Sequence, residues 1–75
     1  MWRGLLAVVL LTWSSQDTSL LVRLERRDNQ AKPYTLIATV PGTMYLDLSA
    51  PNNPHVCYRA RYAAATTYTL AACVR

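Results

Sequence analysis

The chain has 75 residues, of which 52% are hydrophobic and 16% are charged, and its net charge is +4. This length suits one small domain, and the apolar content excludes a disordered acidic or basic tail. The excess of positive charge is too weak to be typical of a nucleic-acid-binding domain, so nucleic acid is not expected as a partner.

The N-terminal segment allows two interpretations. Arg3 precedes an apolar run over residues 5–11, which is followed by Thr12, Trp13 and two serines. This order fits a secretory signal peptide that spans about residues 1–15. The run equally fits a buried β-strand, because strands that are covered on both faces are almost continuously apolar. It is well below the roughly 20 residues that a membrane-spanning helix needs.

The rest of the chain consists of β-branched and alternating segments separated by turn residues. This pattern predicts antiparallel strands. The predicted strands span residues 20–27, 34–40, 43–48, 55–62 and 68–74. Pro41 and Gly42 form the turn between the second and third of these, since proline presets φ and glycine accepts the positive φ of a type II turn.

The last two strands form a hairpin whose register follows from its side chains. With Cys57 opposite Cys73, the arginines share one face and the aromatic and aliphatic side chains share the other. A slip by one residue would turn the arginines inward. The pairs predicted on the apolar face are Tyr58 with Ala72, Ala60 with Leu70, and Tyr62 with Tyr68.

The two cysteines are predicted to form a disulfide. Directly opposed strand positions that lack cross-strand hydrogen bonds have a suitable Cα separation. Such a bridge contributes about 3 kcal/mol in the chain-entropy model, and the even cysteine count fits an oxidising compartment. We therefore expect an extracellular or cell-surface protein, and two free thiols in a reducing compartment are the alternative.

Five segments in chain order resemble strands of a fibronectin type III module. Leu11-Thr12-Trp13 resembles the family's second strand, in which a tryptophan fills the core. Residues 22–27, 34–40, 45–47 and 57–61 resemble the third to the sixth strands. The resemblance extends from Leu10 to the end of the chain. It implies an all-β fold, an immunoglobulin-like antiparallel β-sandwich of about six strands that lacks the family's first strand.

The resemblance implies one domain over residues 5–75, preceded by an extension over residues 1–4. The family's modules act as spacers and recognition surfaces and are not catalytic. The family's corner tyrosine falls near Val56 in this chain, where Tyr58 is its substitute. The predicted core consists of Trp13, Val22, Leu24, Tyr58 and Leu70.

The resemblance also favours the strand interpretation of the N-terminal segment. Removal of residues 5–11 would also remove Trp13 or leave it at the new terminus, and loss of a buried tryptophan costs about 3–5 kcal/mol. Without the family's first strand, the edge near residues 5–13 is apolar and unpaired. Such an edge invites strand addition by a partner or by a second copy. The alternative is a small secreted polypeptide from which a signal peptide has been cleaved.

No enzyme activity, metal ion or cofactor is expected. His55 lies two residues from Cys57 on the predicted wet face, without a pocket or a third orienting group. One histidine and two cysteines leave a zinc site one ligand short. General acid–base catalysis needs two titratable groups at a suitable spacing, and the carboxylates do not form such a pair. They are Asp17, Glu25, Asp28 and Asp47.

Arginines are predicted to gather on the outer face of the sandwich, where the family's third, sixth and seventh strands are neighbours. Guanidinium groups bind sulfate, phosphate and carboxylate through paired hydrogen bonds. A solvated face with weak ion pairs is the alternative. The tyrosines are not expected to interleave with these arginines, as stacking on bases would require. The predicted anion-binding residues are Arg23, Arg59, Arg61 and Arg75, with Arg27 on the same face.

These patterns predict a non-catalytic module that acts as a structural spacer or as a protein or carbohydrate interaction domain. Its expected partner is a protein or an anionic polysaccharide, and neither nucleic acid nor a membrane span is expected. An anion-binding surface module that uses the arginine stripe is an alternative function.

Overall fold

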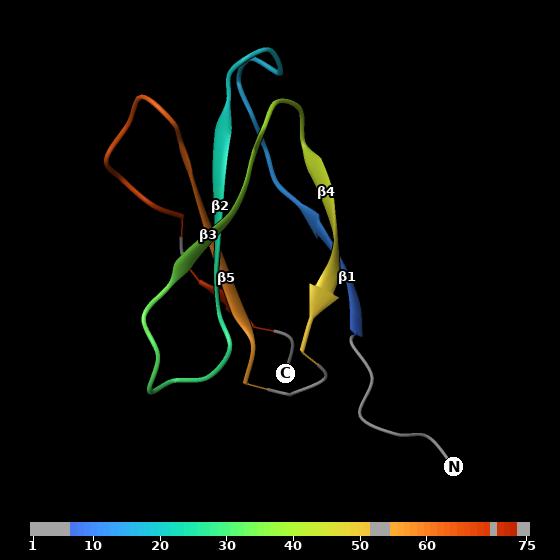
Figure 1. Ribbon diagram of the computed structural model, residues 1–75. Coiled ribbons are helices and arrows are strands. Elements are labelled where there is room, and N and C mark those ends of the chain that lie inside the picture. The colour runs from blue at the N-terminus through green and yellow to red at the C-terminus, as the bar shows by residue number, and fades with distance from the viewer. Residues whose placement is uncertain (1–6, 52–54, 70, 74–75) are drawn as a thin grey trace.

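The computed structural model describes residues 7–51, 55–69 and 71–73. Over these residues the protein is all-β, with six strands and no helix (Figure 1). The strands are β1 (Ala7–Thr12), β2 (Val22–Arg27), β3 (Thr35–Val40), β4 (Met44–Ala50), β5 (Cys57–Tyr62) and β6 (Ala72–Cys73). The expected all-β class of about six strands is therefore confirmed.

The strands form two antiparallel sheets. One sheet contains β1 and β4, and the other has the order β3-β2-β5-β6. Figure 1 shows β1 and β4 together on one side of the molecule, with β2, β3 and β5 on the other. The chain therefore passes from one sheet to the other between β1 and β2, between β3 and β4, and between β4 and β5.

Apolar side chains from both sheets meet between them. Val22 and Leu24 of β2 and Ala60 of β5 are buried and form one cluster. Leu11, which lies in β1, and Trp13, which follows β1, pack against this cluster. The cluster is completed by partly buried side chains of Ile37, Ala38, Val40, Tyr45 and Tyr62. The period-two alternation of β2 and β5 accounts for this arrangement, because alternate residues of a strand face the same side.

The turn between β3 and β4 has the predicted conformation at its glycine. Gly42 has a φ of 89°, which residues with a Cβ rarely adopt. The backbone N–H of Gly42 donates to the carbonyl of Thr18, so the turn is tied to the loop that precedes β2. β4 then begins at Met44.

The closing hairpin differs from the prediction beyond its first two pairs. Cys57 with Cys73 and Tyr58 with Ala72 are partners as expected. The backbone of Ala60, however, is hydrogen-bonded to Thr69, one residue before the predicted partner. This shift by one residue turns Tyr68 to the opposite face, since neighbouring strand residues point to opposite sides. The predicted pairing of Tyr62 with Tyr68 on the apolar face is therefore wrong.

Candidate functional site

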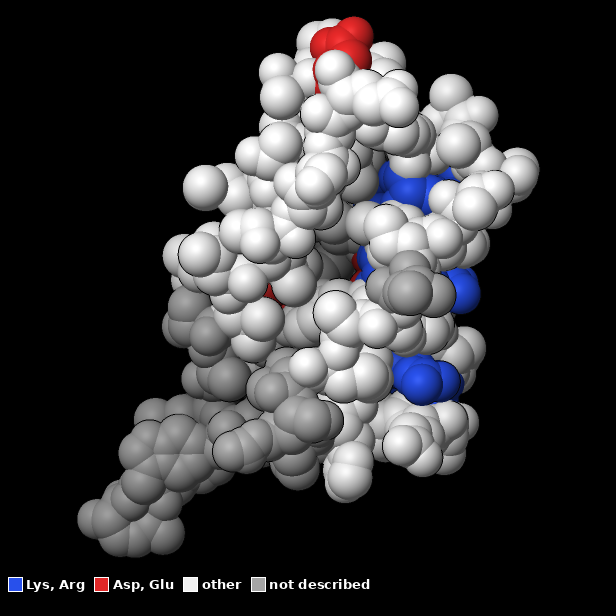
Figure 2. Space-filling view, turned by 180° about the vertical axis from the view of Figure 1, so that it is seen from behind, with Lys and Arg blue, Asp and Glu red and all other residues white. Residues whose placement is uncertain are grey.

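The outer face of the four-stranded sheet concentrates charged side chains. Arg23, Glu25 and Arg27 of β2 alternate with residues that face the core. In the pairing of β2 with β5, Arg23 is the partner of Arg61 and Glu25 is the partner of Arg59. Figure 2 shows the blue Lys and Arg atoms in a series along one side of the view. This face is the candidate site, and we call it the arginine face.

Two tyrosines lie among these arginines. The guanidinium carbons of Arg27 and Arg59 lie 5.0 and 4.2 Å from the centroid of the Tyr34 ring. Those of Arg59 and Arg61 lie 3.8 and 5.4 Å from the centroid of the Tyr68 ring. Each ring is thus within cation–π distance of two guanidinium groups. The expectation that tyrosines do not interleave with the arginines is wrong for Tyr34 and Tyr68.

Glu25 is the carboxylate at the centre of the arginine face. Arg59 Nε donates to its Oε1 at 2.8 Å, the Tyr68 hydroxyl donates to its Oε2 at 2.9 Å, and Arg23 Nη2 lies 3.6 Å from Oε2. Burial alone would raise the pKa of Glu25. The hydrogen bonds from Arg59 and Tyr68 and the nearby positive charges outweigh burial and hold that pKa below its ordinary value.

The arginine face retains capacity for an anion. Its four arginines at positions 23, 27, 59 and 61 outnumber its single carboxylate. Nε of Arg23, Nε of Arg27 and the Tyr34 hydroxyl are buried and have no hydrogen-bond partner among the described residues. Arg61 Nη1 donates to backbone carbonyls of the turn after β5, including that of Ala65, which fixes its side chain. Donors held in place in this way can donate hydrogen bonds to anionic oxygens with little further ordering.

Of the predicted anion-binding residues, the structure describes three and brings them together. Arg23, Arg59 and Arg61 all lie on the arginine face, whereas Arg75 lies outside the described residues. Sequence reasoning missed Tyr34 and Tyr68 as members of this face. A signal for Tyr34 exists in its position before β3, because the next residue, Thr35, is the partner of Arg26 in β2. This register brings Tyr34 beside Arg27.

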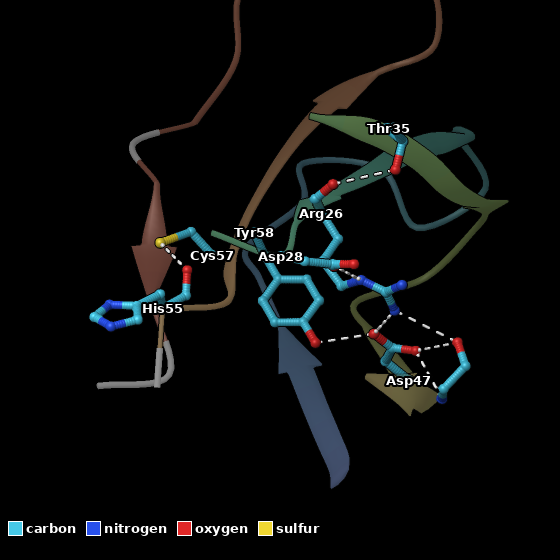
Figure 3. A network of polar contacts seen from close by, with 8 residues as sticks. Arg26, Asp28, Thr35, Asp47, His55, Cys57 and Tyr58 are labelled. Atoms are coloured by element: carbon cyan, nitrogen blue, oxygen red, sulfur yellow. Dashed lines mark hydrogen bonds and ion pairs between the residues drawn. The ribbon is translucent and has the colours of Figure 1, made fainter. Parts of the chain in front are cut away.

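A second cluster of hydrogen-bonded polar residues lies between the sheets (Figure 3). Asp47 of β4 is only 2% exposed. Its Oδ2 accepts hydrogen bonds from Arg26 Nη1 of β2 and from the Tyr58 hydroxyl of β5, both at 2.9 Å. Its Oδ1 accepts from the backbone N–H and the hydroxyl of Ser49 at 3.1 Å. This network therefore joins β4 of one sheet to β2 and β5 of the other.

The partners of Asp47 keep it ionised. Burial alone would raise the pKa of Asp47, but hydrogen bonds from Arg26, the Ser49 backbone and Tyr58 outweigh burial and hold the pKa below its ordinary value. Burial, together with Asp47, raises the pKa of Tyr58 far above its ordinary value, so its hydroxyl remains a donor. Sequence reasoning did not assign this network, although Arg26 shares the strand parity of Val22 and Leu24.

The expected disulfide is present between Cys57 and Cys73, which are direct partners in β5 and β6. Their Cα atoms lie 3.9 Å apart, and 16 positions separate them in sequence. Neither cysteine is therefore a free nucleophile beside His55. Within the described ranges, no three residues of the His, Cys, Asp and Glu types are grouped so that they could hold a metal ion.

The predicted core residues lie as follows. Val22, Leu24 and Tyr58 are buried, with 3%, 2% and 5% of their surfaces exposed. Trp13 is half-buried against the cluster of Val22, Leu24 and Ala60. Leu70 lies outside the described residues.

The chain matches no model of a known protein family, no curated protein and no solved structure. In the described part of the chain there is no helix with the length and apolar character needed to cross a membrane.

Proposed function

We propose that this chain is a non-catalytic recognition module whose arginine face binds an anionic polysaccharide. The fold that we propose for it is an immunoglobulin-like sandwich of the fibronectin type III kind. In that plan the second and fifth strands share one sheet, and the third, sixth and seventh share the other. The pairing of β1 with β4 and the order β2-β5-β6 support this proposal.

The main support for the binding proposal is that Arg23 of β2 lies directly opposite Arg61 of β5. Like charges directly opposite each other in a sheet oppose folding. Glu25 compensates this repulsion only in part, because Arg59 and the Tyr68 hydroxyl also use its two oxygens. Sulfate or carboxylate groups of a polysaccharide would supply the missing negative charge.

Nucleic acid is a weaker proposal for the same face. Proteins that bind single-stranded nucleic acid stack its bases on aromatic side chains. The rings of Tyr34 and Tyr68 are already contacted by guanidinium groups at 3.8–5.4 Å, so a base would have to displace an arginine. A repeating anionic chain needs no ring face and fits the arginine face better.

An extracellular or cell-surface location is part of this proposal. The Cys57–Cys73 disulfide supports it, because disulfides persist in oxidising compartments. The alternative of a secreted polypeptide cleaved near residue 15 would require the loss of β1 and Trp13. That cut would remove one of the two strands of the β1–β4 sheet and part of the packing around Val22 and Leu24.

Retention on a heparin column tests the binding proposal. We expect the double variant Arg23→Gln/Arg27→Gln to elute at lower salt than the wild type. If each of the two partly exposed arginines contributes about 1 kcal/mol, the dissociation constant rises ~30-fold. The control is Lys32→Gln, which removes one positive charge from the exposed segment before β3 and is compared with each single arginine variant. Elution of the folded double variant at the wild-type salt concentration would exclude the arginine face as the binding site.

A further inference from the structure

The two sheets of the sandwich differ in width. The sheet that contains β1 has two strands, whereas the sheet that faces it has four. Within the described residues β1 pairs with β4 alone, so one edge of β1 presents backbone groups that no other strand covers. An edge of this kind is a template for another strand. Among the described residues, the narrower sheet therefore has fewer strands than are needed to cover the inner face of the wider sheet.

A groove follows this edge of β1. It consists of two hollows of about 300 and 190 Å³ that share Trp13, Ala60 and Thr69 as lining residues. The core residues Val22 and Leu24 line its floor, and Ala72 of β6 lies at its far side. Figure 2 shows the surface hollowed near the middle of this view, beside the blue arginine atoms. The groove thus lies where a further strand beside β1 would cover the core.

The indole N–H group of Trp13 also indicates that the groove binds a ligand. Its side chain lines both hollows, and its indole Nε1 is buried without a hydrogen-bond partner among the described residues. Buried N–H groups in folded proteins are nearly always paired. A backbone carbonyl of a strand placed along β1 would accept this hydrogen bond.

The charges of β1 and of the residues that line the groove indicate which kind of segment binds there. No residue of β1 is charged. Arg59 and Arg61 line the groove, but their guanidinium groups lie over the Tyr68 ring on the arginine face. Apart from these two arginines, the residues that line the groove are uncharged, which favours an uncharged segment. A second copy is disfavoured, because it carries the same net charge of +4.

We propose that the β1 edge and its groove bind one extended, uncharged peptide segment of a partner protein, which adds to the β1–β4 sheet as a third strand. The segment pairs with β1 through its backbone and places small apolar side chains from alternate positions into the groove. One of its carbonyls accepts from Trp13 Nε1. The site is separate from the arginine face, so it does not rest on the binding of an anion.

The test uses the full chain with Trp2→Phe, so that Trp13 is the only tryptophan. The probe is an acetylated and amidated heptapeptide of alternating threonine and valine. The control peptide has proline in place of its central valine, which removes a backbone donor. We expect the probe to slow amide hydrogen exchange in β1 and to shift the fluorescence of Trp13, both saturably, while the control peptide does neither.

Two variants at exposed alanines of the same segment complete the test. Ala72→Arg places a charge in the groove, and we expect it to weaken probe binding by ~10-fold or more. Ala71→Arg lies outside the groove lining and should leave binding within about twofold of the parent. The proposal is overturned by equal effects of the two variants, by equal binding of the proline peptide, or by an absence of protection in β1. Protection that depends on protein concentration without the probe would assign the edge to a second copy instead.

Discussion

Asp47 lies between the two sheets with 2% of its surface exposed, although it belongs to a strand whose other side chains are largely apolar. A buried carboxylate is tolerated when its oxygens are fully hydrogen-bonded. Arg26, Tyr58 and Ser49 satisfy both oxygens of Asp47. Because Arg26 and Tyr58 come from the facing sheet, the network fixes how the two sheets lie relative to each other.

The pH dependence of stability tests the role of Asp47. Its pKa is lowered in the folded chain, so its contribution is present above the ordinary pKa of about 3.9 and is lost as pH falls through the lower folded value. We expect the free energy of unfolding to decrease from about pH 5 downward, and Asp47→Asn to flatten this decrease and to cost about 1–3 kcal/mol at pH 7. Urea unfolding at several pH values measures both effects. Parallel curves for the two proteins would show that Asp47 does not titrate with folding.

Some residue-scale features could be predicted and others could not. The partnership of Cys57 with Cys73 followed from the parity of the arginines around it. The position of Tyr68 did not follow, because the shift at Thr69 depends on a turn geometry that no residue type there encodes. Tyr58 was expected as a substitute for the family's corner tyrosine, which bonds to backbone. Its hydroxyl donates instead to the carboxylate of Asp47 in β4, so that role stays a prediction.

At the scale of elements, β6 depends most on its covalent link. Its two described residues are exposed, and its ladder with β5 has two registered pairs. Burial therefore contributes little to holding this strand, and the disulfide accounts for much of its attachment. In the chain-entropy model, a disulfide stabilises the folded state without adding contacts, because it lowers the conformational entropy of the unfolded chain.

We expect the double variant Cys57→Ala/Cys73→Ala to lose about 3 kcal/mol of unfolding free energy, as the chain-entropy model predicts for a loop of this size. Urea unfolding of the variant and of the oxidised wild type measures the loss. The reduced wild type is the matched control, because it retains both cysteine side chains. Coincident unfolding curves of all three proteins would show that the bridge does not stabilise the fold.

Strand positions were predicted better than strand lengths. β2 and β3 begin and end within two residues of their predicted bounds, because alternation and flanking turn residues mark them. The strand predicted over residues 68–74 is assigned only at Ala72–Cys73 within the described residues. Its sequence is largely apolar apart from Thr69, and the residue types alone do not show where hydrogen bonding to β5 stops.

At the scale of the whole molecule, the two sheets present unlike outer surfaces. The four-stranded sheet carries the arginine face, whereas the two-stranded sheet exposes apolar side chains at Leu10, Met44, Leu46 and Leu48. Leu10 and Leu46 are direct partners, so these side chains lie close together on that surface. The all-β class could be predicted from the alternation of residues. The difference between the charged and the apolar outer surface could not, because it depends on which strands share a sheet, and the spacing of strands in the sequence does not determine this.

The position of Trp13 between the sheets is the claim on which the other inferences depend, and a nuclear Overhauser spectrum of the Trp2→Phe variant tests it directly. Trp13 packs against the cluster that contains Val22 and Leu24, so we expect cross-peaks between its indole protons and the methyl groups of both residues. Cross-peaks from the indole only to neighbours in sequence, with fluorescence typical of an exposed tryptophan, would contradict the two-sheet arrangement and the groove beside β1.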